Sequence, residues 1–137
     1  IAVPGAIAAK LVYPQRHVVA VTGDAGFMMN SQEIETAIRC KLPVVILIWN
    51  DSSYGLIEWK QLNQFQRISN VRFNNPDFVA YAESFGARGY RVERTADLPA
   101  ILEEALANDT VSIIDCPVDY RENIKLTDQL GTLVCPT

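Results

Sequence analysis

The alternation of apolar and polar blocks along the chain predicts strands separated by helices. Residues 17–23 ("HVVAVTG") and 43–50 ("PVVILIWN") are short, β-branched and apolar on both faces, which is typical of strands buried in a parallel sheet. Between them, residues 31–42 repeat apolar positions at helical spacing, and Asn30 with Glu33 forms a capping-box pattern before that helix. The first part of the chain therefore predicts a strand-helix-strand unit.

The same alternation continues beyond this unit. A helix that stops at Gly86 is expected to have Asn75 as its N-cap, and a later helix is expected to be capped by Thr95. The pattern predicts an open, mostly parallel α/β sheet with helices on both faces, in a single domain over residues 1–137. The other expected elements are helices at residues 4–12, 54–65, 74–87 and 95–109, and strands at residues 88–93 and 111–118.

Composition and charge narrow the classes of function. The hydrophobic fraction of 49% and the charged fraction of 20% are ordinary for a soluble globular protein. A formal net charge of −4 with scattered Lys and Arg argues against a nucleic-acid surface, and the longest apolar run, residues 42–49, is too short to span a bilayer. We therefore expect neither nucleic acid nor a membrane as a partner.

The start of the chain and its cysteines indicate context. The chain begins at Ile1 rather than at Met and shows no basic leader, so we expect a carboxy-terminal fragment of a larger multidomain enzyme. Cys40, Cys116 and Cys135 show no metal-ligand spacing, and their odd number fits a reducing compartment. A cytoplasmic location is the expectation that follows.

Two strands end in acidic residues, Asp24 and Asp51, which are separated by one strand-helix-strand crossover. Either residue alone is a common turn former. Together, at the ligand-binding end of an open parallel sheet, they favour a carboxylate pair for Mg²⁺, which prefers hard oxygen ligands and substrate phosphates. The small residues Gly23 and Gly26 allow backbone amides to approach a phosphate, and the helix expected from Ser31 would direct its positive end the same way.

Residues 23–51 ("GDAGFMMNSQEIETAIRCKLPVVILIWND") resemble the thiamine-diphosphate motif, which opens with Gly-Asp-Gly and closes with Asn-Asn. The stretches "YGLIEWKQ", "NPDFVAYAESFGARGYRV" and "CPVDYREN" resemble the carboxy-terminal cofactor domain of acetolactate synthases. The resemblance covers residues 4–123 and implies a thiamine-diphosphate-binding fold with flavodoxin-like layering.

The resemblance implies specific site residues. Asp24, Asp51 and the main-chain carbonyl of Ser53 would bind Mg²⁺, and the backbone at Ala25 and Gly26 would meet the diphosphate. The full set of cofactor-binding residues implied in this way is Gly23, Asp24, Ala25, Gly26, Asp51, Tyr54, Gly55 and Leu56.

The chain departs from the family pattern at three places. Ala25 replaces the second glycine of Gly-Asp-Gly, and Asp51 stands where many members have the second Asn. Biosynthetic acetohydroxyacid synthases carry a substrate-selecting Trp where this chain has Lys60, with Trp59 one position earlier. The third departure weakens the expectation of a 2-ketobutyrate acceptor.

The resemblance also implies a reaction. An acetolactate synthase-like transferase of branched-chain amino acid biosynthesis decarboxylates pyruvate and joins the enamine to a second 2-keto acid. The activating glutamate of this family lies in the pyrimidine-binding domain of a second subunit, so we expect a homodimer or homotetramer. No catalytic acid or base is expected in this chain, which should be inactive alone. An FAD, where the parent enzyme carries one, would lie outside this domain.

Two alternatives stay open. One is another thiamine-diphosphate enzyme, either a 2-keto acid decarboxylase, such as benzoylformate or indolepyruvate decarboxylase, or a pyruvate oxidase. The other belongs to a different class, a non-catalytic flavodoxin-like domain that binds a phosphate ligand or a protein partner. Dependence of ligand binding on a metal and on both aspartates separates the second alternative from the first.

Overall fold

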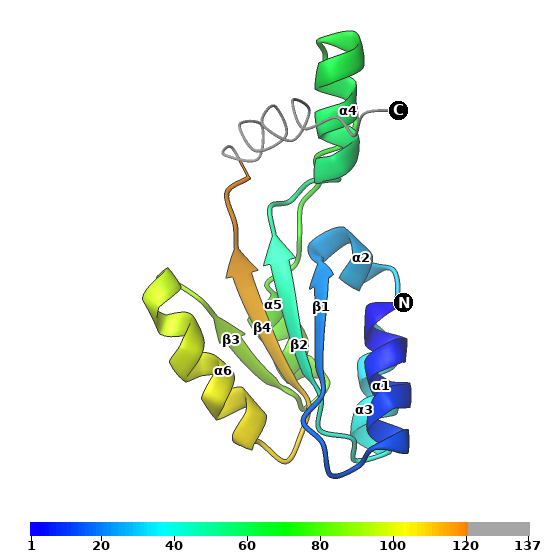
Figure 1. Cartoon of the computed structure of the whole chain (residues 1–137), viewed down its shortest axis with the longest axis vertical. Helices are drawn as coiled ribbons and strands as arrows, with labels where there is room; N and C mark the ends of the chain where they lie inside the picture. The colour runs from blue at the N-terminus through cyan, green and yellow to red at the C-terminus, as the bar shows by residue number, and fades with distance from the viewer. Residues whose placement is uncertain (121–137) are drawn as a thin grey trace, which may run out of the picture.

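A computed structural model describes residues 1–120 and contains one sheet of four parallel strands (Figure 1). The spatial order is β1-β2-β4-β3, and every neighbouring pair is parallel. The predicted α/β class is therefore confirmed. The end of the resembling segment, residues 121–123, and Cys135 lie outside the described residues. The strands are β1 (Val19–Gly23), β2 (Val45–Asn50), β3 (Arg88–Arg91) and β4 (Ser112–Pro117).

Helices cover both faces of the sheet. One core cluster joins α1, α2, α3 and α5 to one face, and a second cluster joins α6 to the other (Figure 1). Within residues 1–120, none of the helices has the length and apolar character needed to cross a bilayer. The helices are α1 (Ala2–Val12), α2 (Asp24–Met28), α3 (Glu33–Arg39), α4 (Gly55–Phe65), α5 (Phe78–Ser84) and α6 (Leu98–Ala107), with a 3₁₀ turn η1 (Thr95–Asp97) before α6.

The two central strands form the core of the domain. Side chains of β2 alternate between the two clusters, with Ile46 and Ile48 on one face and Val45 and Leu47 on the other. Such two-sided burial requires a continuous apolar run, because successive side chains of a strand point to opposite faces. The prediction of a strand buried on both faces is correct for β2.

The same prediction is wrong for β1. Ala20 is buried, whereas Val19 and Val21 are 42% and 53% exposed. The strand lies at one edge of the sheet, and α6 packs over β4 rather than over β1. The apolar pattern of β1 therefore resembles that of β2, but within the described part of the chain only one face of β1 is covered.

The predicted N-caps need correction. The chain turns from β1 directly into the short helix α2, so the next helix starts at Glu33 and its N-cap is Gln32 instead of Asn30. Asn30 lies in the connection, where its main-chain carbonyl accepts the Glu33 N–H at 3.2 Å. Thr95 lies within the 3₁₀ turn η1, and no side chain caps α6.

The N-cap of α5 is also two residues later than predicted. Asp77, not Asn75, is the N-cap, and its carboxylate accepts the main-chain N–H groups of Val79 and Ala80. The predicted end of this helix is correct, because Gly86 follows the helix with a φ of 80°, a left-handed conformation that glycine adopts without steric cost. Asn75 is thus free for a different role.

Candidate functional site

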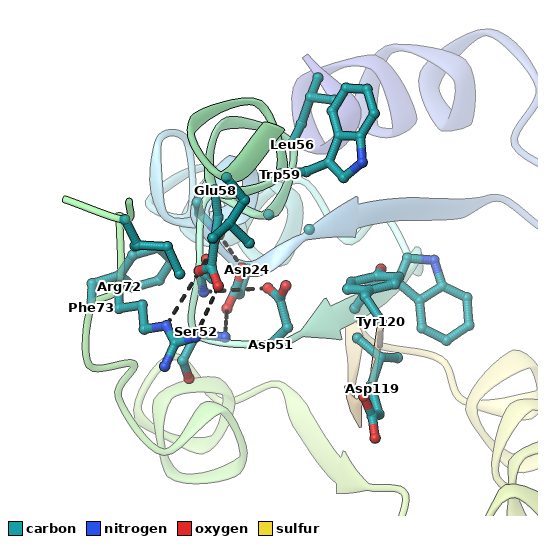
Figure 2. A pocket seen from close by; sticks show the side chains of 18 of the residues that line it. Asp24, Asp51, Ser52, Leu56, Glu58, Trp59, Arg72, Phe73, Asp119 and Tyr120 are labelled. Carbon is teal, nitrogen blue, oxygen red and sulfur yellow. Dashed lines mark hydrogen bonds and ion pairs between the residues drawn. The ribbon is translucent and has the colours of Figure 1, made fainter. Parts of the chain in front are cut away.

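A pocket opens at the carboxyl ends of β1, β2 and β4, between the sheet and helix α4 (Figure 2). Asp24 follows β1, Asp51 follows β2, and Tyr120 follows β4, so three strands direct side chains into the same space. Glu58 and Trp59 of α4 form the opposite wall. This is the edge at which open parallel sheets bind their ligands.

Asp24 is the buried centre of the site. It is 1% exposed and is the first residue of α2. Its Oδ2 accepts the main-chain N–H of Ser52 at 2.8 Å and the Asn75 amide at 2.6 Å, and its Oδ1 accepts the Ala25 N–H at 2.8 Å. A buried carboxylate needs such partners, and three neutral donors hold this one in a single orientation.

The loop after β2 supplies one of these donors through an uncommon backbone conformation. Ser52 has a φ of 55°, in the left-handed region that residues other than glycine rarely adopt. This turn directs the Ser52 N–H at Asp24. Backbone of this kind persists where the surroundings determine it, and it is enriched at functional sites.

Asp51 faces the same pocket but is less buried than Asp24 (Figure 2). Burial, and secondly the negative charge of Asp24, raise the pKa of the Asp51 carboxyl. A Cβ at Gly55 would lie 3.1 Å from Asp51 Oδ2, so glycine at this position leaves room around the carboxylate. Two neighbouring negative charges repel each other, and a cation between them would relieve that repulsion.

The oxygen donors at this pocket fit Mg²⁺, because Mg²⁺ does not need a site built entirely from protein side chains. Among residues 1–120, no group of three or more His, Cys, Asp or Glu side chains could hold a metal. A cation at Asp24 and Asp51 would therefore need main-chain, water or ligand oxygens as well. Mg²⁺ commonly uses one or two carboxylates and completes its shell with waters and substrate phosphates.

The helix that begins beside the pocket is α2, not the helix predicted from Ser31. Because α2 starts at Asp24, the main-chain amides of its first turn, including those of Ala25 and Gly26, have no partner one turn earlier. Position 26 is also tightly packed, since a Cβ there would lie 3.0 Å from Thr22 Oγ1. The backbone at this point is thus close to its neighbours, and Asp24 Oδ1 already accepts the Ala25 N–H at 2.8 Å.

Polar contacts hold α4 at the rim of the pocket. Ser53 Oγ donates to Glu58 Oε2 at 2.6 Å, and Arg72 Nη2 donates to Glu58 Oε1 at 2.8 Å. The Arg72 guanidinium and then the Ser53 hydroxyl lower the pKa of Glu58, so this pairing exists at neutral pH and is lost only as the pH falls through the lowered value. The Tyr54 ring packs against Phe73 with ring centroids 5.0 Å apart.

The structure brings most of the residues predicted for the site together. Two do not line the pocket: Gly26 lies within α2, and Tyr54 packs against Phe73. The predicted residues that line it are Gly23, Asp24, Ala25, Asp51, Ser53, Gly55 and Leu56.

Comparison with known proteins identifies the family. The model of the family described as "Thiamine pyrophosphate enzyme, C-terminal TPP binding domain" matches residues 1–116. The chain belongs to this family. The resemblance inferred from the motif is therefore confirmed.

The relatives of this thiamine-diphosphate-binding domain are much longer proteins. It is 48% identical over 126 residues to an acetolactate synthase of Bacillus subtilis (strain 168), covering 92% of this chain and 22% of that protein. It is 43% identical over 130 residues to a catabolic acetolactate synthase of Raoultella terrigena, covering 95% and 23%. Among solved structures, a thiamine diphosphate-dependent 4-hydroxybenzoylformate decarboxylase of Rhodococcus jostii RHA1 matches with a TM-score of 0.80 and 30% identity, over 88% of this chain and 23% of that one.

The residue that sequence reasoning missed in this thiamine-diphosphate-binding domain is Asn75. The sequence pattern predicts a helix cap at this position, but the amide nitrogen of Asn75 donates to Asp24 and to Asn50 Oδ1 at 2.9 Å. The available signal was Asp77, a better-placed cap before Phe78, which leaves Asn75 unassigned. Nothing in the local sequence indicates that its partner is a residue from another strand end.

Proposed function

We propose that this domain binds the diphosphate of thiamine diphosphate through Mg²⁺, held by Asp24, Asp51 and the main-chain carbonyl of Ser53. The observation that carries the proposal is that buried Asp24 and partly buried Asp51 face one pocket at the carboxyl end of the sheet, in a chain of this family. The neighbouring backbone of Ala25 and Gly26 would meet the diphosphate, and Gly23, Gly55, Leu56 and Tyr54 would lie along the cofactor.

The chain's own residues would bind and shield the cofactor. When bound, thiamine diphosphate would supply a nucleophile for a keto carbon and an electron-accepting ring for decarboxylation. The two aspartates would neutralise the charge of the cation. Apolar side chains of α4 and of the following loop would restrict the access of water from the opposite wall of the pocket. These side chains are Leu56, Trp59, Leu62, Ile68 and Phe73.

The reaction proposed for the complete protein is that of an acetolactate synthase-like transferase. This chain spans about a fifth of the length of the two acetolactate synthases that it resembles, at 48% and 43% identity. We assign no catalytic acid or base to this chain, which we expect to be inactive alone as a carboxy-terminal fragment. The pyrimidine-binding domain of a second subunit would complete the site in a cytoplasmic homodimer or homotetramer, and any FAD would lie outside this domain.

A second candidate is a 2-keto acid decarboxylase. The fold match to a 4-hydroxybenzoylformate decarboxylase, with a TM-score of 0.80, favours it. The two reactions share the decarboxylation and differ in the product, because the remaining two-carbon unit would either be joined to a second 2-keto acid or be released as an aldehyde. Proton NMR of the complete protein with thiamine diphosphate, Mg²⁺ and pyruvate separates them. Acetolactate supports the synthase, and acetaldehyde alone supports the decarboxylase.

The site itself is tested by cofactor binding in the complete protein. Thiamine diphosphate is titrated in the presence of Mg²⁺ and followed by the fluorescence of the tryptophans, two of which, Trp49 and Trp59, line the pocket. Removing a side chain that only hydrogen-bonds a metal ligand already weakens metal binding about 10- to 100-fold, so Asp24→Ala and Asp51→Ala should weaken thiamine diphosphate binding about 100-fold or more.

Asp109→Ala is the matched control, since Asp109 is exposed and precedes β4 at the opposite end of the sheet. Its affinity for thiamine diphosphate should be that of the wild type. Folded Asp24→Ala and Asp51→Ala proteins that bind the cofactor as tightly as the control would remove the metal assignment and favour the non-catalytic domain.

A further inference from the structure

We infer that Asn75 is a positioning residue for the carboxylate of Asp24, and that Asn50 and Asp115 determine which way its amide points. The inference rests on the proposed function, because Asp24 is a metal ligand only in that proposal. The four side chains form a continuous hydrogen-bonded relay from the middle of the sheet to the pocket.

The relay begins at a buried charge. Asp115 lies in β4 with no exposed surface, and its Oδ2 is 3.1 Å from Nη2 of Arg91. Arg91 is its register partner on β3 and also lies 3.5 Å from the carboxylate of Asp77. A carboxylate paired with a guanidinium accepts hydrogen bonds and cannot donate them.

This acceptor-only group fixes the direction of the two amides. Asn50 Nδ2 donates to Asp115 Oδ1 at 2.9 Å, which turns Asn50 Oδ1 toward Asn75. Asn75 must then present its nitrogen, and Nδ2 donates to Asn50 Oδ1 at 2.9 Å and to Asp24 Oδ2 at 2.6 Å. Reversing either amide would place two oxygens against each other. The orientation of the Asn75 amide that Asp24 requires is therefore also the one imposed by Asp115, three hydrogen bonds away along the relay.

The relay also determines which oxygen of Asp24 remains available. Oδ2 accepts two donors, the Ser52 N–H and the Asn75 amide, which use both of its lone pairs. Among residues 1–120, Oδ1 accepts the Ala25 N–H alone and keeps one lone pair. Oδ1 is thus the oxygen that the relay leaves for a cation.

The position of Asn75 leaves one of its own polar atoms without a hydrogen bond among the described residues. Its Oδ1 is buried and finds no hydrogen-bond partner among the residues that the structure describes. A buried acceptor without a partner is unfavourable, so a purely structural amide would be expected to satisfy both ends. The arrangement instead satisfies the donor side, which faces Asp24.

The test measures metal binding rather than activity. In the complete protein with saturating thiamine diphosphate, Mn²⁺ is added and the free ion is counted by electron paramagnetic resonance. Asn75→Ala should weaken Mn²⁺ binding about 10- to 100-fold, the usual effect of removing a side chain that hydrogen-bonds a metal ligand. Asn50→Ala should have a smaller effect, and the double variant should bind no more weakly than Asn75→Ala, because Asn50 acts through Asn75.

Asn108→Ala is the matched control for loss of a partly buried amide. Asn108 donates to Tyr90 Oη at 2.8 Å and to Ser112 Oγ at 3.0 Å, at the opposite end of β4. It should lower the melting temperature as Asn75→Ala does and leave Mn²⁺ binding at the wild-type value. If Asn75→Ala does not fold, the isosteric Asp115→Asn is measured instead and should also weaken Mn²⁺ binding.

Three results would overturn the inference. Asn75→Ala, or Asp115→Asn in its place, with wild-type Mn²⁺ affinity would show a structural role only. Additive losses for Asn50→Ala and Asn75→Ala would show that Asn50 does not act through Asn75. A wild-type protein that does not bind Mn²⁺ with thiamine diphosphate would remove the proposed function itself, an outcome that the wild-type titration alone identifies.

Discussion

The sheet and helix α4 are stabilised in opposite ways. In β2 the first five side chains are apolar and the first four of them are buried, whereas α4 has no buried residue over its 11 residues. Leu56 and Phe65 of α4 are 69% and 67% exposed. Figure 1 shows α4 extending beyond the end of the sheet that carries the site.

Polar contacts take the place of apolar burial in α4. Besides the Glu58–Arg72 pair, Gln61 exchanges two hydrogen bonds with the main chain of Ser69. Exposed ion pairs contribute about 0–1 kcal/mol each, whereas burying one large apolar side chain contributes about 1.5–3 kcal/mol. The pocket therefore has one rigid wall, which carries Asp24, and one wall that is easily displaced.

The largest expected effect compares the same substitution in the two regions. Phe27 has no exposed surface and packs edge-on against Phe78 with ring centroids 5.4 Å apart, so Phe27→Ala should lower the free energy of unfolding by about 3–5 kcal/mol. Phe65→Ala on α4 should change it by less than about 0.5 kcal/mol. Urea unfolding of the two variants of the complete protein measures both. Equal losses would show that α4 is packed as tightly as the sheet.

A smaller effect is expected at the thiols. Burial, and secondly the charge of Asp115, raise the pKa of the Cys116 thiol to about 11. Because this folded-state pKa exceeds that of an exposed thiol, ionisation opposes folding, and stability falls as the pH rises from the unfolded value toward 11. At pH 8, iodoacetamide should label Cys116 about tenfold or more slowly than exposed Cys40, as read by peptide mass spectrometry. Equal labelling would contradict a rigid sheet.

The smallest expected effect concerns the attachment of α4. Glu58→Gln weakens the ion pair with Arg72, and since such a pair contributes up to about 1 kcal/mol, tryptic cleavage at Lys60 should accelerate about two- to fivefold. Glu35→Gln is the control, because Glu35 pairs with Arg39 at 2.9 Å on α3 instead. An unchanged rate in Glu58→Gln would mean that contacts other than this pair hold α4.

Patterns within one element predicted the fold well. Strand-like apolar runs identified each strand that the structure describes. The motif spacing placed Asp24 and Asp51 at strand ends, and the structure shows that these two strands are neighbours. Single-residue caps were less predictable, as Asn30 and Asn75 show, because several polar residues near a helix start compete for the same amides. The local sequence cannot decide that competition when a distant partner is available.

The class of fold, the family motif and the pair of carboxylates could be predicted from the sequence, since each depends on residue types at fixed spacing along the chain. The open face of β1, the position of α4 outside the core and the contact of Asn75 with Asp24 could be seen only in the folded chain. These features depend on which elements become neighbours. Asp24 and Asn75 meet across a separation of 51 positions, and no local pattern records such a contact.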